Sequence, residues 1–279
     1  MVLLTITQSA RLTLGVMPTI DVTGGTVHYE TRGQGTPVML ISGLAGTGRG
    51  WGPQIELFSR DFFTIVPDHP GTGGSSIPDN GFEIEHHAAA MADLARSLDA
   101  GPVHLVGSST GGAIAHVMAL DHPDIVASAT LASSWARNDD FFRQQFAVRK
   151  QVLLELGTDA YTDLTALFLY SPEFIANRTD VVQAWIDTAK ASGTAPEVLA
   201  ARIDMIMRHD QAERLEQVAC PVLVLVGSAD SCTPPYLSEA LAAAIPGARL
   251  EILTGGHIIY KEDPEGFHSA VSGFIRSCD

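Results

Sequence analysis

The chain has 279 residues, of which 46% are hydrophobic and 18% are charged. This length predicts about one or two domains and a core large enough to need no disulfides. The composition excludes a disordered chain, a collagen-like repeat and a disulfide-rich mini-protein. The formal net charge of −15 would repel phosphate backbones and anionic membranes, so we expect no nucleic-acid partner and no membrane partner.

The three cysteines, Cys220, Cys232 and Cys278, are too few and too scattered for a disulfide framework or a zinc site. We therefore expect reduced thiols, no metal and a cytoplasmic location. No apolar run approaches the roughly 18 residues that a bilayer span requires. Residues 1–17 lack a basic segment ahead of their apolar patch, so we interpret them as an extension before the folded domain rather than a secretory signal. Met17 is an alternative start.

From residue 18 onward, short apolar runs alternate with helical patterns. The sequence predicts strands at 19–23, 26–31, 37–42, 62–67, 102–107, 126–132, 221–227 and 249–253. The first two form a hairpin that turns at Gly24-Gly25. Several later runs are apolar at consecutive positions, which is typical of parallel strands covered on both faces. Helical patterns follow at 83–99, 109–121, 236–245 and 264–276. Together they predict an α/β fold with a mostly parallel, doubly wound sheet.

The stretch 135–215 has helical patterns but no strand-like run. We interpret it as a helical cap inserted after the sixth strand, between core segments at 18–134 and 216–279. The alternative is a second, unrelated helical domain.

Gly107-Ser108-Ser109-Thr110-Gly111 lies between a predicted strand and a predicted helix. This is the G-x-S-x-G pattern in the context of a nucleophile elbow, where a sharp turn exposes the central serine. The flanking glycines avoid collisions with neighbouring backbone. Ser109 is therefore the candidate nucleophile, and Ser108 is the rival hydroxyl one position early.

A serine hydroxyl needs a base to remove its proton, and the base needs an acid to orient it. His257 follows the last predicted strand, where a loop can bring it to the elbow. Asp230 follows the strand at 221–227, and Asp210 is the second candidate acid. Among the other histidines, His86, His87, His209 and His268 fit solvated helical positions, and His28 and His104 fit packed or surface positions. The order Ser109, Asp230, His257 is the order that this fold class uses.

The tetrahedral intermediate of acyl transfer carries an oxyanion that requires preorganised donors. We assign these donors to the backbone N–H groups of Thr110 and Leu44, the latter in the turn Ser42-Gly43-Leu44-Ala45-Gly46. That turn and the run at 71–76 are glycine-rich, but neither has the lysine of a phosphate-binding loop. We therefore expect no nucleotide and no other cofactor.

The segments LISGLAG, DHPGTGGS, VGSSTGGAIA, LVGSADSCTP and GGHIIYKEDPEGF resemble the landmarks of the α/β-hydrolase superfamily across residues 18–278. This resemblance implies an α/β-hydrolase fold with a cap. The cap sequence is most similar to the aminoacrylate hydrolases of pyrimidine catabolism, and next to the 3-oxoadipate enol-lactonases. Three positions depart from the common pattern: Ser42 and Ser108 stand where many relatives have histidine, and Pro70 where many have arginine.

We expect a small-molecule substrate to meet aromatic side chains of the cap, with Trp135, Phe142, Phe168 and Tyr170 as candidate pocket residues. Arg137, Arg143 and Arg149 could pair with a substrate carboxylate, although solvated charges are the favoured interpretation.

The sequence thus predicts a serine hydrolase of small carboxylic esters, lactones or amides, similar to carboxylesterases and lactonases. Two alternatives stay open. One is a lyase or cofactor-free oxygenase that uses His257 as its base, and the other is a non-enzymatic small-molecule receptor. A homodimer is possible.

Overall fold

A computed structural model describes residues 18–278, so the predicted extension at 1–17 lies outside the described residues. One eight-stranded sheet forms the centre, in the order β1-β2-β4-β3-β5-β6-β7-β8. Its strands are β1 (Thr19–Val22), β2 (Gly25–Arg32), β3 (Pro37–Ile41), β4 (Phe63–Pro67), β5 (Val103–Ser108), β6 (Val126–Ala132), β7 (Val222–Gly227) and β8 (Arg249–Leu253). The hairpin strand β2 pairs antiparallel with β1 and β4, and the remaining pairs are parallel.

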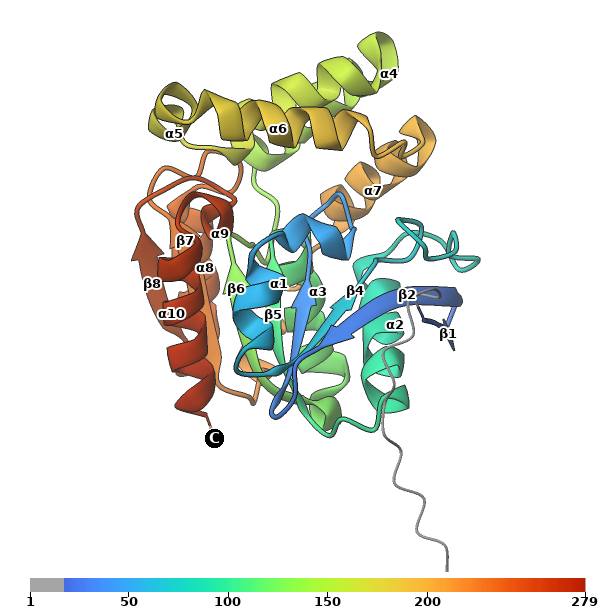
Figure 1. Ribbon diagram of the computed structural model, residues 1–279, viewed down its shortest axis with the longest axis vertical. Helices are drawn as coiled ribbons and strands as arrows, with labels where there is room; N and C mark the ends of the chain where they lie inside the picture. Colours follow the sequence, from blue (N-terminus) through green and yellow to red (C-terminus); the bar gives the residue numbers. More distant parts are fainter. Residues whose placement is uncertain (1–17, 279) are drawn as a thin grey trace, which may run out of the picture.

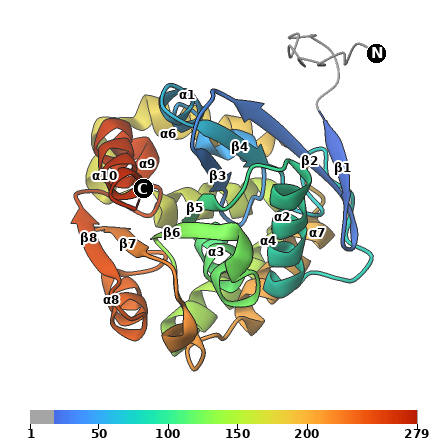
Figure 2. The same cartoon turned by 90° about the horizontal axis from the view of Figure 1, so that it is seen from below.

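Helices cover both faces of the sheet (Figure 2). One face carries α1 (Gln54–Ser59), α9 (Ile259–Glu262) and α10 (Pro264–Arg276), and the other carries α2 (Ile84–Ser97), α3 (Thr110–Asp121) and α8 (Pro235–Ala244). Each layer has its own apolar core, because the central strands bury both of their faces. Continuous burial along β5 and β7 explains why their sequences are apolar at consecutive positions.

Four helices lie between β6 and β7 and sit above the end of the sheet where the parallel strands finish (Figure 1). We call α4–α7 the cap helices: α4 (Asp140–Leu169), α5 (Pro172–Asn177), α6 (Thr179–Lys190) and α7 (Pro196–Arg208). Gly157, with φ of 87°, breaks α4 into two helical pieces. Because α4 packs on both α6 and α7, the helices form one layer over the sheet edge.

The predicted fold class is confirmed, and each predicted strand and helix of the core has a counterpart. The short helices α1 and α9 were not predicted. Each has fewer than seven residues, too few for a helical period to show in the sequence.

Candidate active site

Ser109 occupies the sharp turn between β5 and α3. Its backbone has φ of 55° and ψ of −117°, a conformation that non-glycine residues rarely adopt. The turn is held by a hydrogen bond from the Ser109 N–H to the Ala132 carbonyl at 2.7 Å. A strained residue held by its surroundings at the start of a buried helix fits a nucleophile elbow.

The two outer glycines of the motif have no room for a side chain. A Cβ at Gly107 would lie 2.2 Å from the Gly111 carbonyl oxygen, and one at Gly111 would lie 2.0 Å from the Ile41 carbonyl oxygen. The elbow therefore packs directly against the end of β3. This packing brings the turn that follows β3 to Ser109, and a Cβ at Gly43 would be 3.5 Å from the Ser109 Cβ.

Asp230 and His257 meet at the ends of β7 and β8. Nδ1 of His257 lies 2.9 Å from Oδ2 and 3.0 Å from Oδ1 of Asp230, and both residues are buried. The carboxylate also accepts hydrogen bonds from the backbone N–H groups of Cys232 and Thr233 and from the Thr233 hydroxyl. These donors fix the orientation of the carboxylate toward His257.

Burial lowers the pKa of His257, whereas the Asp230 carboxylate and the neighbouring Cys232 thiol raise it, and the net shift is upward. With Nδ1 engaged by Asp230, the ring presents Nε2 as its second functional nitrogen. Asp210, the alternative acid, is instead exposed and pairs with Arg137 at 2.7 Å.

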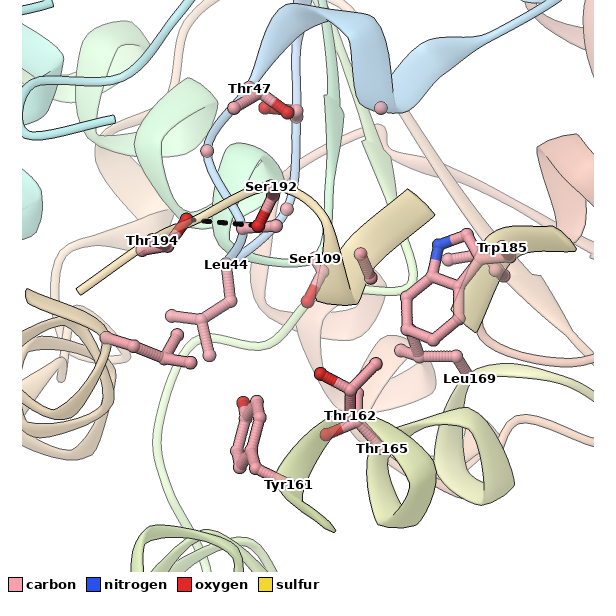
Figure 3. A pocket seen from close by; sticks show the side chains of 18 of the residues that line it. Leu44, Thr47, Ser109, Tyr161, Thr162, Thr165, Leu169, Trp185, Ser192 and Thr194 are labelled. Carbon is pink, nitrogen blue, oxygen red and sulfur yellow. Dashed lines mark hydrogen bonds between the residues drawn. The ribbon is translucent and has the colours of Figure 1, made fainter. Parts of the chain in front are cut away.

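A pocket of about 190 Å³ opens between the elbow and the cap helices. Ser109, His257 and Leu44 all line it, and in Figure 3 the Ser109 hydroxyl points into it. The cap side of the pocket carries Tyr161, Thr162, Thr165, Leu169 and Trp185 (Figure 3). The hydrogen bonds found among residues 18–278 do not include one between the Ser109 hydroxyl and His257. That contact is often loose in free enzymes and tightens with substrate.

The four aromatic residues expected to line the pocket do not line it. Trp135 packs on Phe142 with ring centroids 4.7 Å apart, and Tyr170 stacks on Phe174 at 5.5 Å. All but Phe168 are at most 1% exposed. The Phe168 ring lies against the guanidinium of Arg149, whose Cζ is 5.4 Å from the ring centroid. The expectation that these four side chains line the pocket was therefore wrong. Helical spacing shows that rings share a face of a helix, but it does not show whether that face meets a cavity or a neighbouring element.

Arg149 is the second departure from expectation. Arg137 and Arg143 are exposed and paired with acids, as expected. Arg149 instead lines the pocket at 3% exposure. Its guanidinium contacts Cys232 Sγ at 3.5 Å, the Tyr161 hydroxyl at 3.4 Å and Thr165 Oγ1 at 3.3 Å. Its Nε is buried without a partner, and no carboxylate pairs with it among the described residues.

Arg202, which the sequence interpretation did not single out, reaches from α7 to the turn after β3. Its Nε donates to the Leu44 carbonyl at 2.9 Å, and its terminal nitrogens contact the Pro70 carbonyl, His87 and His69. His87 was expected to be solvated but is fully buried against this guanidinium. His209, also expected at a solvated position, is buried with its Nε2 3.0 Å from that of His116.

Comparison with known proteins agrees with the observed fold. Residues 36–264 match the family described as "alpha/beta hydrolase fold", so the chain belongs to that family and is a hydrolase.

Curated relatives are similar over nearly the whole chain. It is 36% identical over 257 residues to the "Putative carbamate hydrolase RutD" of Azorhizobium caulinodans, covering 91% of this chain and 96% of the relative. The protein of the same name from Caulobacter vibrioides is 32% identical over 273 residues, covering 95% and 98%. These names agree with the resemblance seen in the cap sequence.

Solved structures are similar as well. A thermophilic esterase from Thermogutta terrifontis matches with a TM-score of 0.83 at 26% identity, covering 94% of this chain and 99% of that one. An enol-lactonase from Burkholderia xenovorans matches with a TM-score of 0.85 at 24% identity, covering 93% and 100%, a likeness of fold. Within residues 18–278, no helix is both long and apolar enough to cross a membrane.

Proposed function

We propose that this chain is a serine hydrolase that cleaves small carboxylic esters, lactones, amides or carbamates through an acyl-enzyme on Ser109. The observation that carries the proposal is the buried Asp230–His257 pair at a pocket whose floor holds Ser109 in a strained turn. An imidazole oriented by a carboxylate beside a serine is the arrangement that activates a hydroxyl nucleophile.

In the acylation step, Ser109 Oγ attacks the substrate carbonyl carbon while its proton passes to Nε2 of His257. The carbonyl π bond breaks and its oxygen becomes an oxyanion, which the N–H groups of Leu44 and Thr110 stabilise. Collapse of this intermediate breaks the bond to the leaving alcohol or amine, which takes the proton from His257. Asp230 stabilises the imidazolium that exists between the two transfers.

In the deacylation step, His257 removes a proton from water, and the resulting hydroxide attacks the acyl carbon. Collapse of the second oxyanion breaks the bond to Ser109 Oγ, which recovers the proton from His257. The net reaction adds one water across the scissile bond, and this chain's own side chains carry every proton.

The pocket favours a small, anionic substrate. Its volume of about 190 Å³ lies below the roughly 300–1,000 Å³ typical of sites for drug-sized ligands. Arg149 presents a buried guanidinium that has no carboxylate partner within residues 18–278. Such a group is stabilised by a ligand anion that supplies the missing charge. The relatives named as carbamate hydrolases also support a small substrate, because a carbamate has a small acyl group.

The test compares wild type, Ser109→Ala and Ser108→Ala on short p-nitrophenyl esters, small lactones and carbamates. We expect Ser109→Ala to lower kcat by about 10⁴- to 10⁶-fold, the range for removal of a triad serine. Ser108→Ala should keep at least about a tenth of wild-type kcat, since only the residue at the apex of the elbow can attack.

Near-wild-type turnover by Ser109→Ala would overturn the assignment. Turnover by that variant of substrates that need only proton abstraction would point instead to a lyase with His257 as base. Binding without turnover of any substrate by wild type would indicate a receptor.

A further inference from the structure

The turn that supplies Leu44 is held by a side chain from the cap. Nε of Arg202, in α7, donates to the Leu44 carbonyl at 2.9 Å, and one terminal nitrogen donates to the Pro70 carbonyl at 3.1 Å. The chain separations are 158 and 132 residues, so these contacts exist only when the cap helices are seated on the core. A guanidinium has donors in a fixed planar fork, so it sets the orientation of both carbonyls together.

The remaining donors of Arg202 meet two buried histidines. One terminal nitrogen lies 3.1 Å from Nε2 of His87, and the other lies 2.8 Å from Nδ1 of His69. Because arginine can only donate, both ring nitrogens must be unprotonated acceptors. His87 then carries its proton on Nδ1, which is 3.0 Å from the Glu83 carbonyl. Burial and the charge of Arg202 lower the pKa of His87 to about 3, so it stays neutral.

The charge of Arg202 has no counter-ion among the described residues, although its side chain is 0% exposed. Burial of an unpaired cation is costly even when its hydrogen bonds are satisfied. Arg202 and Leu44 both line the pocket that holds Ser109. Negative charge that develops on the substrate oxygen at this turn would therefore interact with a preorganised cation in a site that excludes much of the solvent.

We propose that Arg202 is a positioning residue for the oxyanion turn, which makes hydrolysis depend on the seating of the cap helices. Its guanidinium fixes the Leu44 carbonyl, one peptide after the Leu44 N–H in the same tight turn, which the Gly46 N–H closes on the Gly43 carbonyl at 2.9 Å. Its charge favours the oxyanion. This inference rests on the proposed function, because it concerns the oxyanion of the same reaction. It also explains how the turn Asp68-His69-Pro70 is held without an arginine at position 70: the guanidinium arrives from the cap.

The experiment measures Arg202→Met, Arg202→Lys and a control, Arg208→Met. Arg208 lies on the same helix but is exposed and pairs with Glu83. Steady-state kinetics on a short p-nitrophenyl ester give kcat and KM. A small fluorophosphonate gives the rate of phosphonylation of Ser109, in which the Oγ–P bond forms, the P–F bond breaks and the proton passes to His257. That reaction uses the same oxyanion donors but no substrate turnover.

We expect Arg202→Met to lower kcat by about 10- to 100-fold with KM within about threefold, because a misplaced oxyanion donor affects the transition state more than the bound substrate. Phosphonylation should slow by a similar factor. Arg202→Lys should recover part of the loss, since it keeps the charge but not the fork. Arg208→Met should match wild type in both readouts.

Wild-type kcat and phosphonylation in folded Arg202→Met would overturn the inference, as would a loss confined to KM. Full activity in Arg202→Lys would overturn the claim that the planar donors of the guanidinium are needed. If circular dichroism shows that Arg202→Met is unfolded, the kinetics of Arg202→Lys provide the test. Failure of the proposed function looks different. In that case wild type itself neither hydrolyses the esters nor reacts with the fluorophosphonate, and both proposals fall together.

Discussion

Oδ2 of Asp230 lies 2.9 Å from Nδ1 of His257, and neither side chain is more than 2% exposed. The imidazole therefore keeps its proton on Nδ1 and leaves Nε2 free to accept one. The pair joins two loops that are 27 residues apart in the chain, and both loops leave the same end of neighbouring parallel strands.

Replacement of Asp230 by Asn should change the pH profile as well as the rate. His257 acts as a base only when neutral, so activity rises as pH passes upward through its pKa. Burial lowers this pKa, and Asp230 is the largest influence that raises it above the usual value of 6.5. Asp230→Asn should therefore move the acidic limb of kcat/KM to lower pH, and should lower kcat by about 10⁴-fold through the wrong tautomer. An unmoved acidic limb would argue that another group titrates.

Replacement of Arg149 should separate anionic from neutral substrates. We expect Arg149→Met to lower kcat/KM for a short ester that bears a carboxylate by about 10- to 100-fold, the effect of losing one charge-assisted contact. When the free carboxylate of that compound is converted to its methyl ester, kcat/KM should change by less than about threefold on the same substitution. The measurement is kcat/KM for the matched pair of substrates, with exposed Arg143→Met as the control. Equal losses on both substrates would mean that Arg149 only supports the cap.

Two glycine-to-alanine substitutions test the packing of the elbow. Gly111→Ala places a Cβ 2.0 Å from the Ile41 carbonyl oxygen, whereas Gly273→Ala, in α10, meets nothing within 4 Å. We expect the first to lower the free energy of unfolding by about 1–3 kcal/mol, as overpacking does. The second should raise it by about 0.5–1 kcal/mol, because alanine favours the helix. Urea unfolding followed by circular dichroism measures both, and similar stability of the two variants would contradict the packing described for the elbow.

The core fold was predictable because its signals are local. The buried strand β7 is apolar along its whole length, and β5 departs from this pattern only at His104 and Ser108. The motif around Ser109 combines a strand, a tight turn and a helix within a few residues. The candidate residues Asp230 and His257 were predictable because each follows a strand end, and parallel strands bring such ends to one edge.

The pocket was not predictable in the same way. Trp135 and Phe142 face the core rather than the cavity, while Arg149 and Arg202 face inward from helices whose sequences look like ordinary charged surfaces. A helical pattern identifies which residues share a face, but the element that covers this face is set by tertiary packing. For the same reason His87, two residues after Glu85 on a helix face that looks exposed in the sequence, is a buried acceptor for Arg202.

The central claim is that His257 activates Ser109 for covalent attack. The most direct test incubates wild type and His257→Gln with a small fluorophosphonate and maps the adduct by peptide mass spectrometry. We predict a single adduct on Ser109 in wild type, and labelling slowed by at least about 10³-fold in His257→Gln, as expected when the general base is lost. An adduct on another residue, or equal labelling of both proteins, would contradict the account.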